Sequence, residues 1–178
     1  MEKQMEICER FAGKHIVKRN GSVKSFDVTK IVSAVTRAGT WAPTGMGRQA
    51  VKIVVVQDKD TVAKLERMNA AVLGNPDAHP FYGAPTVLVV FADSTVPTHV
   101  PDGSLVLGTM LLAASSIGLG SCWINRAKES FQTEEGKALM RKWGLADTYE
   151  GIGICILGYV KGELPAPAPR KADYIVTV

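Results

Sequence analysis

Cysteine is scarce in this sequence, and its scarcity excludes two common kinds of site. The 178 residues contain three cysteines, Cys8, Cys122 and Cys155, and no Cys-x-x-Cys pair. A disulfide framework or a structural zinc site needs more cysteines at closer spacing. The three histidines are dispersed among predicted loops without ligand spacing. We therefore expect no disulfide and no metal site, and a reducing compartment, the cytoplasm.

Strong charge is lacking as well, and the first residues do not predict a leader segment. The formal net charge is only +4, from 21 basic and 17 acidic residues, which is small beside the concentrated basic face of a nucleic-acid-binding protein. The first residues, MEKQMEICERFAGK, have no apolar stretch of the secretory kind. Residues 103–124 are apolar enough to test as a membrane span, but they contain four glycines and have no basic flank. We expect no nucleic-acid partner and no membrane partner.

Hydrophobic periodicity predicts an alternation of helices and strands. Helices are predicted over residues 2–11, 28–39, 59–73, 102–118 and 134–143, with Asp58 capping the third, Asp102 capping the fourth and Gly39 closing the second. Strands are predicted over 51–57, 85–93, 121–125 and 153–160. The continuous apolar run at 85–93 is typical of a strand buried on both faces. This order places the chain in the α/β or α+β class, as one domain of residues 1–178.

The predicted helix 102–118 is apolar on nearly every side, with the run SLVLGTMLLAASSIGLG from residue 104 onward. A helix of this kind must be buried somewhere. A chain of this length has too few elements to surround it, so a second copy of the chain is the natural cover. The sequence therefore predicts a homodimer.

No acid–base pair and no Ser–His–Asp order is recognisable in the sequence. Chemistry without a catalytic side chain is typical of enzymes in which a cofactor carries the reaction. Basic residues gather near both ends of the chain: Lys14, Lys18, Arg19 and Lys24, then Arg170 and Lys171. Two interpretations stay open, namely two solvated faces or one anion site assembled from two distant segments.

Six short motifs, taken in order, resemble the nitroreductase family. They are WAPTGMGRQ at 41–49, FYGAP at 81–85, DGS at 102–104, GLGSCWI at 118–124, GY at 158–159 and PRK at 169–171. Each motif alone is weak, but six in this order and spacing are specific. The resemblance implies an α+β, three-layer fold with a central, mainly antiparallel sheet. It also implies an obligate homodimer with two FMN sites at the subunit interface.

The resemblance assigns contacts with the flavin ring to three segments. The loop after the second helix lies along FMN, with Pro43, Thr44, Gly45, Met46, Gly47 and Gln49. Trp123 and Ile124 lie beside the ring, and the backbone at Asn125 and Arg126 supplies a hydrogen-bond donor to flavin N5. Asn69 is expected at the pyrimidine edge. Arg126 stands where many relatives have glycine, and we expect it to narrow the pocket or to attract the phosphates of NAD(P)H or an acidic acceptor.

The N-terminal residues 1–27 match the family less closely. Ser22-Val23-Lys24 resembles the second half of the family's Arg-x-Ser-x-Arg/Lys motif, with Arg19 one residue early for the first position. Arg10 and Lys14 have the same separation without the serine. The resemblance thus implies an FMN phosphate held by Lys24, by Arg19 or Arg10, and by Arg170 and Lys171 on an extended tail, residues 161–178. Residues 16–31 also resemble the opening of the ATP-cone regulatory domain, whose remainder is absent.

These features lead to one principal hypothesis and two alternatives. The principal hypothesis is an FMN-dependent oxidoreductase that moves hydride from NADH or NADPH, in ping-pong fashion, to a small electron-poor acceptor such as a nitroaromatic compound or a quinone. The first alternative is another reaction on the same scaffold, either reductive dehalogenation or flavin destruction. The second is a protein without enzymatic activity that binds a flavin or another nucleotide.

Overall fold

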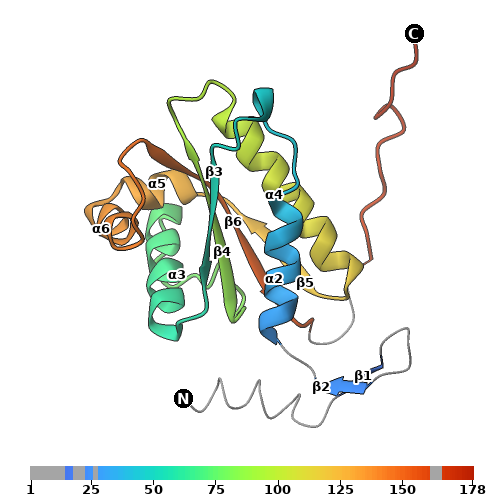
Figure 1. Cartoon of the computed structure of the whole chain (residues 1–178), viewed down its shortest axis with the longest axis horizontal. Helices are drawn as coiled ribbons and strands as arrows, with labels where there is room; N and C mark the ends of the chain where they lie inside the picture. The colour runs from blue at the N-terminus through green and yellow to red at the C-terminus, as the bar shows by residue number, and fades with distance from the viewer. Residues whose placement is uncertain (1–14, 18–22, 26–27, 161–165) are drawn as a thin grey trace.

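The computed structural model describes residues 15–17, 23–25, 28–160 and 166–178. Its main body consists of α2 (Val28–Gly39), the short 3-10 turn η1 (Gly45–Gly47), β3 (Val51–Val56), α3 (Lys59–Leu73), β4 (Thr86–Asp93), α4 (His99–Ser116), β5 (Gly120–Ile124), α5 (Ala127–Gln132), α6 (Glu134–Lys142) and β6 (Tyr149–Gly158). Two short strands, β1 (His15–Val17) and β2 (Val23–Ser25), pair with each other outside this body (Figure 1).

The central sheet has the strand order β3-β4-β6-β5, and every neighbouring pair is antiparallel. Strand β4 lies inside the sheet, and its residues from Thr86 to Ala92 are all buried. Because other elements cover both faces of this strand, the side chains on both faces are apolar and the sequence does not alternate between apolar and polar residues. The structure confirms both the antiparallel sheet and the doubly buried strand.

Helices cover both faces of the sheet (Figure 1). On one face, Val87, Val89 and Phe91 of β4 belong to a core that also contains side chains of α3, α5 and α6. On the other face, Leu88 and Val90 pack with side chains of α2 and α4. The alternation follows from the two-residue period of a strand. Three layers result, and the α+β architecture is confirmed.

The bounds of α2 and α3 agree with the predicted helices. Asp58 caps α3 by accepting a hydrogen bond from the Thr61 N–H at 2.9 Å, and Gly74 ends the helix with a positive φ of 77°. Helix α5 was not predicted, because six residues are too few to show a helical period. The helix predicted over residues 2–11 lies outside the described residues.

The predicted start of α4 at Asp102 is wrong. The helix begins at His99, so this histidine lies in a first turn and not in a loop. Pro101 is compatible with that turn, because the first N–H groups of a helix have no partner within the helix. The backbone N–H of Asp102 bonds to the Thr98 carbonyl at 2.9 Å. Since Asp102 lies inside the helix, its carboxylate is available for another contact.

Candidate functional site

The loop 43–49 connects α2 to β3 and exposes most of its side chains. Trp41, just before it, and Met46 within it are among the most exposed large apolar residues of the described chain. The backbone is nevertheless ordered by local bonds, such as that from the Gln49 N–H to the Thr44 hydroxyl at 3.1 Å. Met46 and Gln49 have φ angles of 56° and 52°. Residues that carry a side chain rarely adopt φ angles in this left-handed region. The surrounding structure must therefore hold the loop in place.

The buried carboxylate of Asp102 holds the loop in place. The Gly45 N–H donates to Asp102 Oδ1 at 2.9 Å, and the Thr98 hydroxyl donates to Asp102 Oδ2, also at 2.9 Å. Asp102 is only 3% exposed. A Cβ at position 45 would collide with the Thr98 hydroxyl, so glycine is required for this close approach to α4. At Gly47, by contrast, a Cβ would meet nothing within 4 Å.

The second segment assigned to the flavin follows β5. Pairing with β6 ends at Ile124, which is buried, whereas Trp123 beside it is partly exposed. Arg126 then turns the chain with φ 73° and ψ 17° and precedes α5 as its N-cap residue. A left-handed arginine costs conformational energy that a glycine would not. The departure from glycine at this position therefore has a structural consequence as well as a chemical one.

Asn69 joins α3 to this turn. Its Nδ2 donates to the Asn125 carbonyl at 2.7 Å, and its Oδ1 accepts from Arg126 Nε at 3.1 Å. The residue is fully buried. The resemblance implied a contact between Asn69 and the pyrimidine edge of a flavin, but the structure engages both ends of its amide with the turn. Arg126 likewise does not extend freely, since its Nε is bound to Asn69.

The structure describes only some of the residues expected at the phosphate. Lys24 lies on β2, opposite Ile16, while Arg19, Ser22, Arg10 and Lys14 lie outside the described residues. Arg170 and Lys171 belong to the exposed tail 166–178, which leaves the main body as an extended trace (Figure 1). Within the tail, Arg170 Nη1 donates to the Ala168 carbonyl at 3.2 Å.

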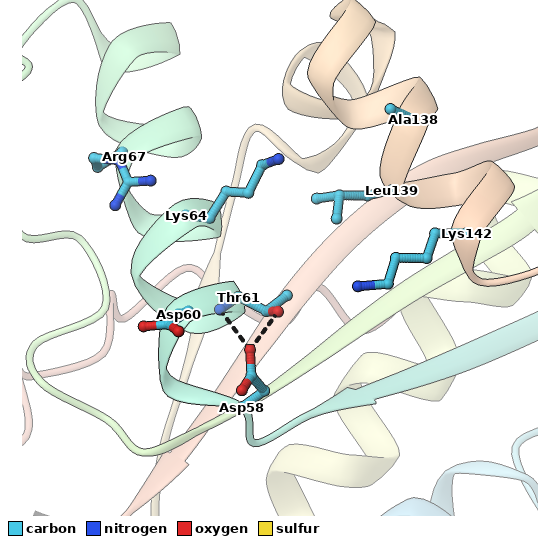
Figure 2. Close-up of a pocket in the computed structure, with 8 residues that line it drawn as sticks. All are labelled: Asp58, Asp60, Thr61, Lys64, Arg67, Ala138, Leu139 and Lys142. Atoms are coloured by element: carbon cyan, nitrogen blue, oxygen red, sulfur yellow. Dashed lines mark hydrogen bonds between the residues drawn. The ribbon is translucent and has the colours of Figure 1, made fainter. Parts of the chain in front are cut away.

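A hollow of about 470 Å³ lies between α3 and α6 (Figure 2). Two of its polar groups stabilise the fold: Asp58 bonds to the hydroxyl and the N–H of Thr61, and Lys64 pairs with Glu135 at 3.0 Å. A second hollow of about 400 Å³ is bordered by α5 and α6. Neither is lined by a residue that the motifs assign to FMN. The exposed motif residues Trp41, Met46 and Trp123 lie outside both hollows.

The described cysteines do not form a reactive site. Cys122 is exposed and Cys155 is buried, and both are free thiols. Burial, with a smaller effect from Cys122, raises the pKa of Cys155 to about 12, so this thiol stays protonated at neutral pH. Within the described residues no group of three or more His, Cys, Asp or Glu side chains is placed to hold a metal ion. Over the same residues no helix has the length and apolarity needed to cross a bilayer.

Buried side chains hold the two segments that the motifs assign to the flavin, and the sequence did not predict this role for them. Asp102 was predicted only as a helix cap, and the flavin contact of Asn69 stays a prediction. The available signal was a short polar residue within an otherwise apolar helix segment, which is normally buried only when it is hydrogen-bonded. That signal does not reveal the partner, which lies 56 or 57 residues away in each case.

Comparisons with known proteins identify the family and the fold. The model of the nitroreductase family matches residues 19–159. A curated relative from Archaeoglobus fulgidus, provisionally named NADH dehydrogenase/NAD(P)H nitroreductase, is 26% identical over 137 residues, which cover 74% of each chain. A nitroreductase from Bacteroides fragilis, solved with bound FMN, has the same fold with a TM-score of 0.76 and 24% identity, covering 98% of this chain and 97% of its own. A nitroreductase from Desulfitobacterium hafniense, also solved with FMN, has a TM-score of 0.76 and 24% identity, covering 86% and 88%.

Proposed function

The chain belongs to the nitroreductase family, and from that premise we propose that it is an FMN-dependent oxidoreductase that accepts hydride from NADH or NADPH. The name of the Archaeoglobus relative supports the electron donor. The bound FMN of the Bacteroides and Desulfitobacterium structures supports the cofactor. Bound FMN would supply the redox chemistry, and the protein would supply binding, orientation and electrostatics.

One observation carries the proposal. Two backbone segments that the family motifs assign to FMN, the loop 43–49 and the turn at Asn125 and Arg126, are each held by a fully or nearly buried polar side chain from a neighbouring helix. Their outer surfaces are open. Backbone donors held in advance by a rigid scaffold suit a planar cofactor, because little reorganisation is needed when it binds.

We also propose that the working molecule is a homodimer. Leu105 and Leu112 of α4 are 47% and 74% exposed, although the helix is otherwise apolar and packed against the sheet. Seven residues apart, they lie on one face of the helix. A second copy that covers this face would bring its own tail near the first copy, so Arg170 and Lys171 of one subunit would hold the FMN phosphate of the other together with Lys24.

The remaining parts of the proposal concern the acceptor and the compartment. We propose a ping-pong sequence, in which the oxidised nicotinamide nucleotide leaves before a small electron-poor acceptor takes its place at the same surface. The exposed positions around Trp123 and the loop 43–49 leave room for a planar acceptor. The free cysteines fit a reducing compartment, and the cytoplasm is the compartment we propose.

The absorption spectrum of the purified protein tests cofactor and reaction together. We expect flavin bands that bleach when NADH or NADPH is added without oxygen and return when a quinone or nitroaromatic acceptor follows. A colourless protein that cannot be reconstituted with FMN would contradict the cofactor. A yellow protein that neither nicotinamide nucleotide bleaches would contradict the hydride transfer and favour a flavin-binding protein without this activity. Binding of ATP in place of FMN would favour a nucleotide sensor.

A further inference from the structure

Asn69 is one of four buried polar residues in the described chain, and its bonds point to a role in orienting a single peptide unit. Its side chain donates to the Asn125 carbonyl and accepts from Arg126 Nε. Asn69 thus bonds to both residues that the Asn125–Arg126 peptide bond joins, to the carbonyl of the first and to the side chain of the second. A carbonyl bonded to a fully buried side chain must point toward the interior.

The planarity of the peptide then decides where the N–H points. The described peptide bonds are all trans, and in a trans peptide the N–H lies opposite the carbonyl. Because the Asn125 carbonyl accepts from Asn69, the Arg126 N–H points away from Asn69, in a stretch of chain where Trp123 and Asn125 are exposed. We infer that Asn69 is a positioning residue that aims the Arg126 N–H at the place of flavin N5, an assignment that rests on the proposed function.

The backbone at Arg126 explains why a positioning residue is needed. Its left-handed conformation, φ 73° and ψ 17°, is unfavourable for a side-chain-bearing residue. Rotation of the peptide would relieve this cost and would also turn the N–H away. The Asn69 donor opposes that rotation, because a rotated peptide would leave the buried amide without its acceptor. The bond from Arg126 Nε to Asn69 Oδ1 keeps the arginine side chain on the same side.

The test uses a nearly isosteric variant, Asn69→Asp. A carboxylate keeps an acceptor for Arg126 Nε but has no N–H for the Asn125 carbonyl, and it sets oxygen against oxygen. The matched control is Asn75→Asp, the same substitution at an exposed residue just beyond α3, where the carboxylate still accepts from the Asp77 N–H. Crystal structures of the parent and both variants, with and without FMN, report the orientation of the peptide. Anaerobic stopped-flow measurements report the limiting rate of flavin reduction at saturating NADH.

We expect the Asn125 carbonyl to turn away from residue 69 in Asn69→Asp and to stay in place in Asn75→Asp. The limiting rate should fall about 100-fold in Asn69→Asp, as expected for one lost donor to a reacting centre, and by less than about threefold in the control. Retained FMN and a similar Tm would exclude a general loss of structure. The inference is overturned if Asn69→Asp keeps both the carbonyl orientation and the parent's reduction rate.

Two further outcomes keep the inference separable from the proposed function. If Asn69→Asp does not fold, the parent crystallised with FMN decides, since an Arg126 N–H that points away from N5 overturns the inference. If the parent binds no FMN, the proposed function is contradicted. The inference that the Arg126 N–H points at flavin N5 is then contradicted as well. The peptide orientation would still be decided by the structures without cofactor, and an unchanged carbonyl in Asn69→Asp would contradict the role of Asn69 by itself.

Discussion

At the scale of single residues, two short polar side chains perform the same task at different places. Asp102 on α4 holds the backbone at Gly45, and Asn69 on α3 holds the backbone at Asn125. Both are buried and hydrogen-bonded, as buried polar groups must be. Each joins a helix to a loop that follows another element. This arrangement fits chemistry carried by a cofactor, because the protein's contribution is then the position of backbone groups.

Replacement of Asp102 tests the first of these contacts. In Asp102→Ala the Gly45 N–H and the Thr98 hydroxyl lose their acceptor, so we expect a loss of about 1–3 kcal/mol in the free energy of unfolding. FMN should bind about tenfold more weakly, because the loop 43–49 is no longer held. Urea denaturation and FMN dissociation measure the two effects. Asp102→Asn is the control, since its amide oxygen can still accept from Gly45. Equal FMN affinity in Asp102→Ala and the parent would show that FMN binding does not depend on the bond between Asp102 and the loop.

At the scale of elements, the ends of α3 and α4 differ although both carry an aspartate. Asp58 caps α3 by bonds to Thr61, as local rules predict. Asp102 lies one turn inside α4, where Thr98 is the N-cap residue and makes no side-chain cap bond. The same residue type thus stabilises a helix terminus in one case and a distant loop in the other. The difference comes from position, because Asp58 precedes its helix whereas Asp102 is the fourth residue of α4.

The cap of α3 makes a prediction for pH dependence. The two hydrogen bonds from Thr61 lower the pKa of Asp58 below its ordinary value near 3.8, so the folded state favours the ionised carboxylate. The stabilisation is complete above the ordinary pKa and is lost as the pH falls through the lowered one. We expect Asp58→Ala to have a lower Tm than the parent at pH 7 and a smaller difference near pH 3.

The control for this prediction is Asp58→Asn, because asparagine caps helices without an ionisable group. Its Tm relative to Asp58→Ala should depend little on pH. Differential scanning calorimetry of the three proteins at both pH values provides the comparison. A parent advantage over Asp58→Ala that is the same at pH 7 and near pH 3 would contradict the ionised cap.

At the scale of the whole molecule, two features of the described chain leave apolar side chains exposed in a single subunit. One is the exposed apolar face of α4 at Leu105 and Leu112. The other is the tail 166–178, which leaves the body and carries the exposed side chains Tyr174, Ile175 and Val176. Apolar groups left in water cost free energy that association would recover. Both features are accounted for by the proposed homodimer.

A charge on the α4 face tests the dimer. Leu112→Glu would place a carboxylate of each subunit at the interface, and burial of an unpaired charge is strongly unfavourable. We expect the dimer dissociation constant to rise by at least about 100-fold, measured by analytical ultracentrifugation, with loss of bound FMN. Leu73→Glu is the matched control, because Leu73 is also an exposed leucine but lies at the end of α3. A Leu112→Glu protein that stays dimeric would show that the interface does not include this face of α4.

The sequence by itself determined those parts of the molecule that depend on neighbours along the chain. The bounds of α2 and α3, the cap at Asp58 and the buried strand β4 follow from periodicity and local hydrogen bonding, which act over a few residues. The motifs also located the loop 43–49 and the turn after β5. Helix α5 was missed because it is too short to show a period.

Only the tertiary structure decided what Asp102 and Asn69 bind. The loop residues that they bind lie more than 50 residues away, and a side chain's local pattern carries no record of which loop will pack against it. The same holds for the requirement of glycine at position 45, which comes from the approach of Thr98. Contacts of this kind exist only after the sheet has brought α3 and α4 beside those loops, and they decide where the backbone donors of the candidate site point.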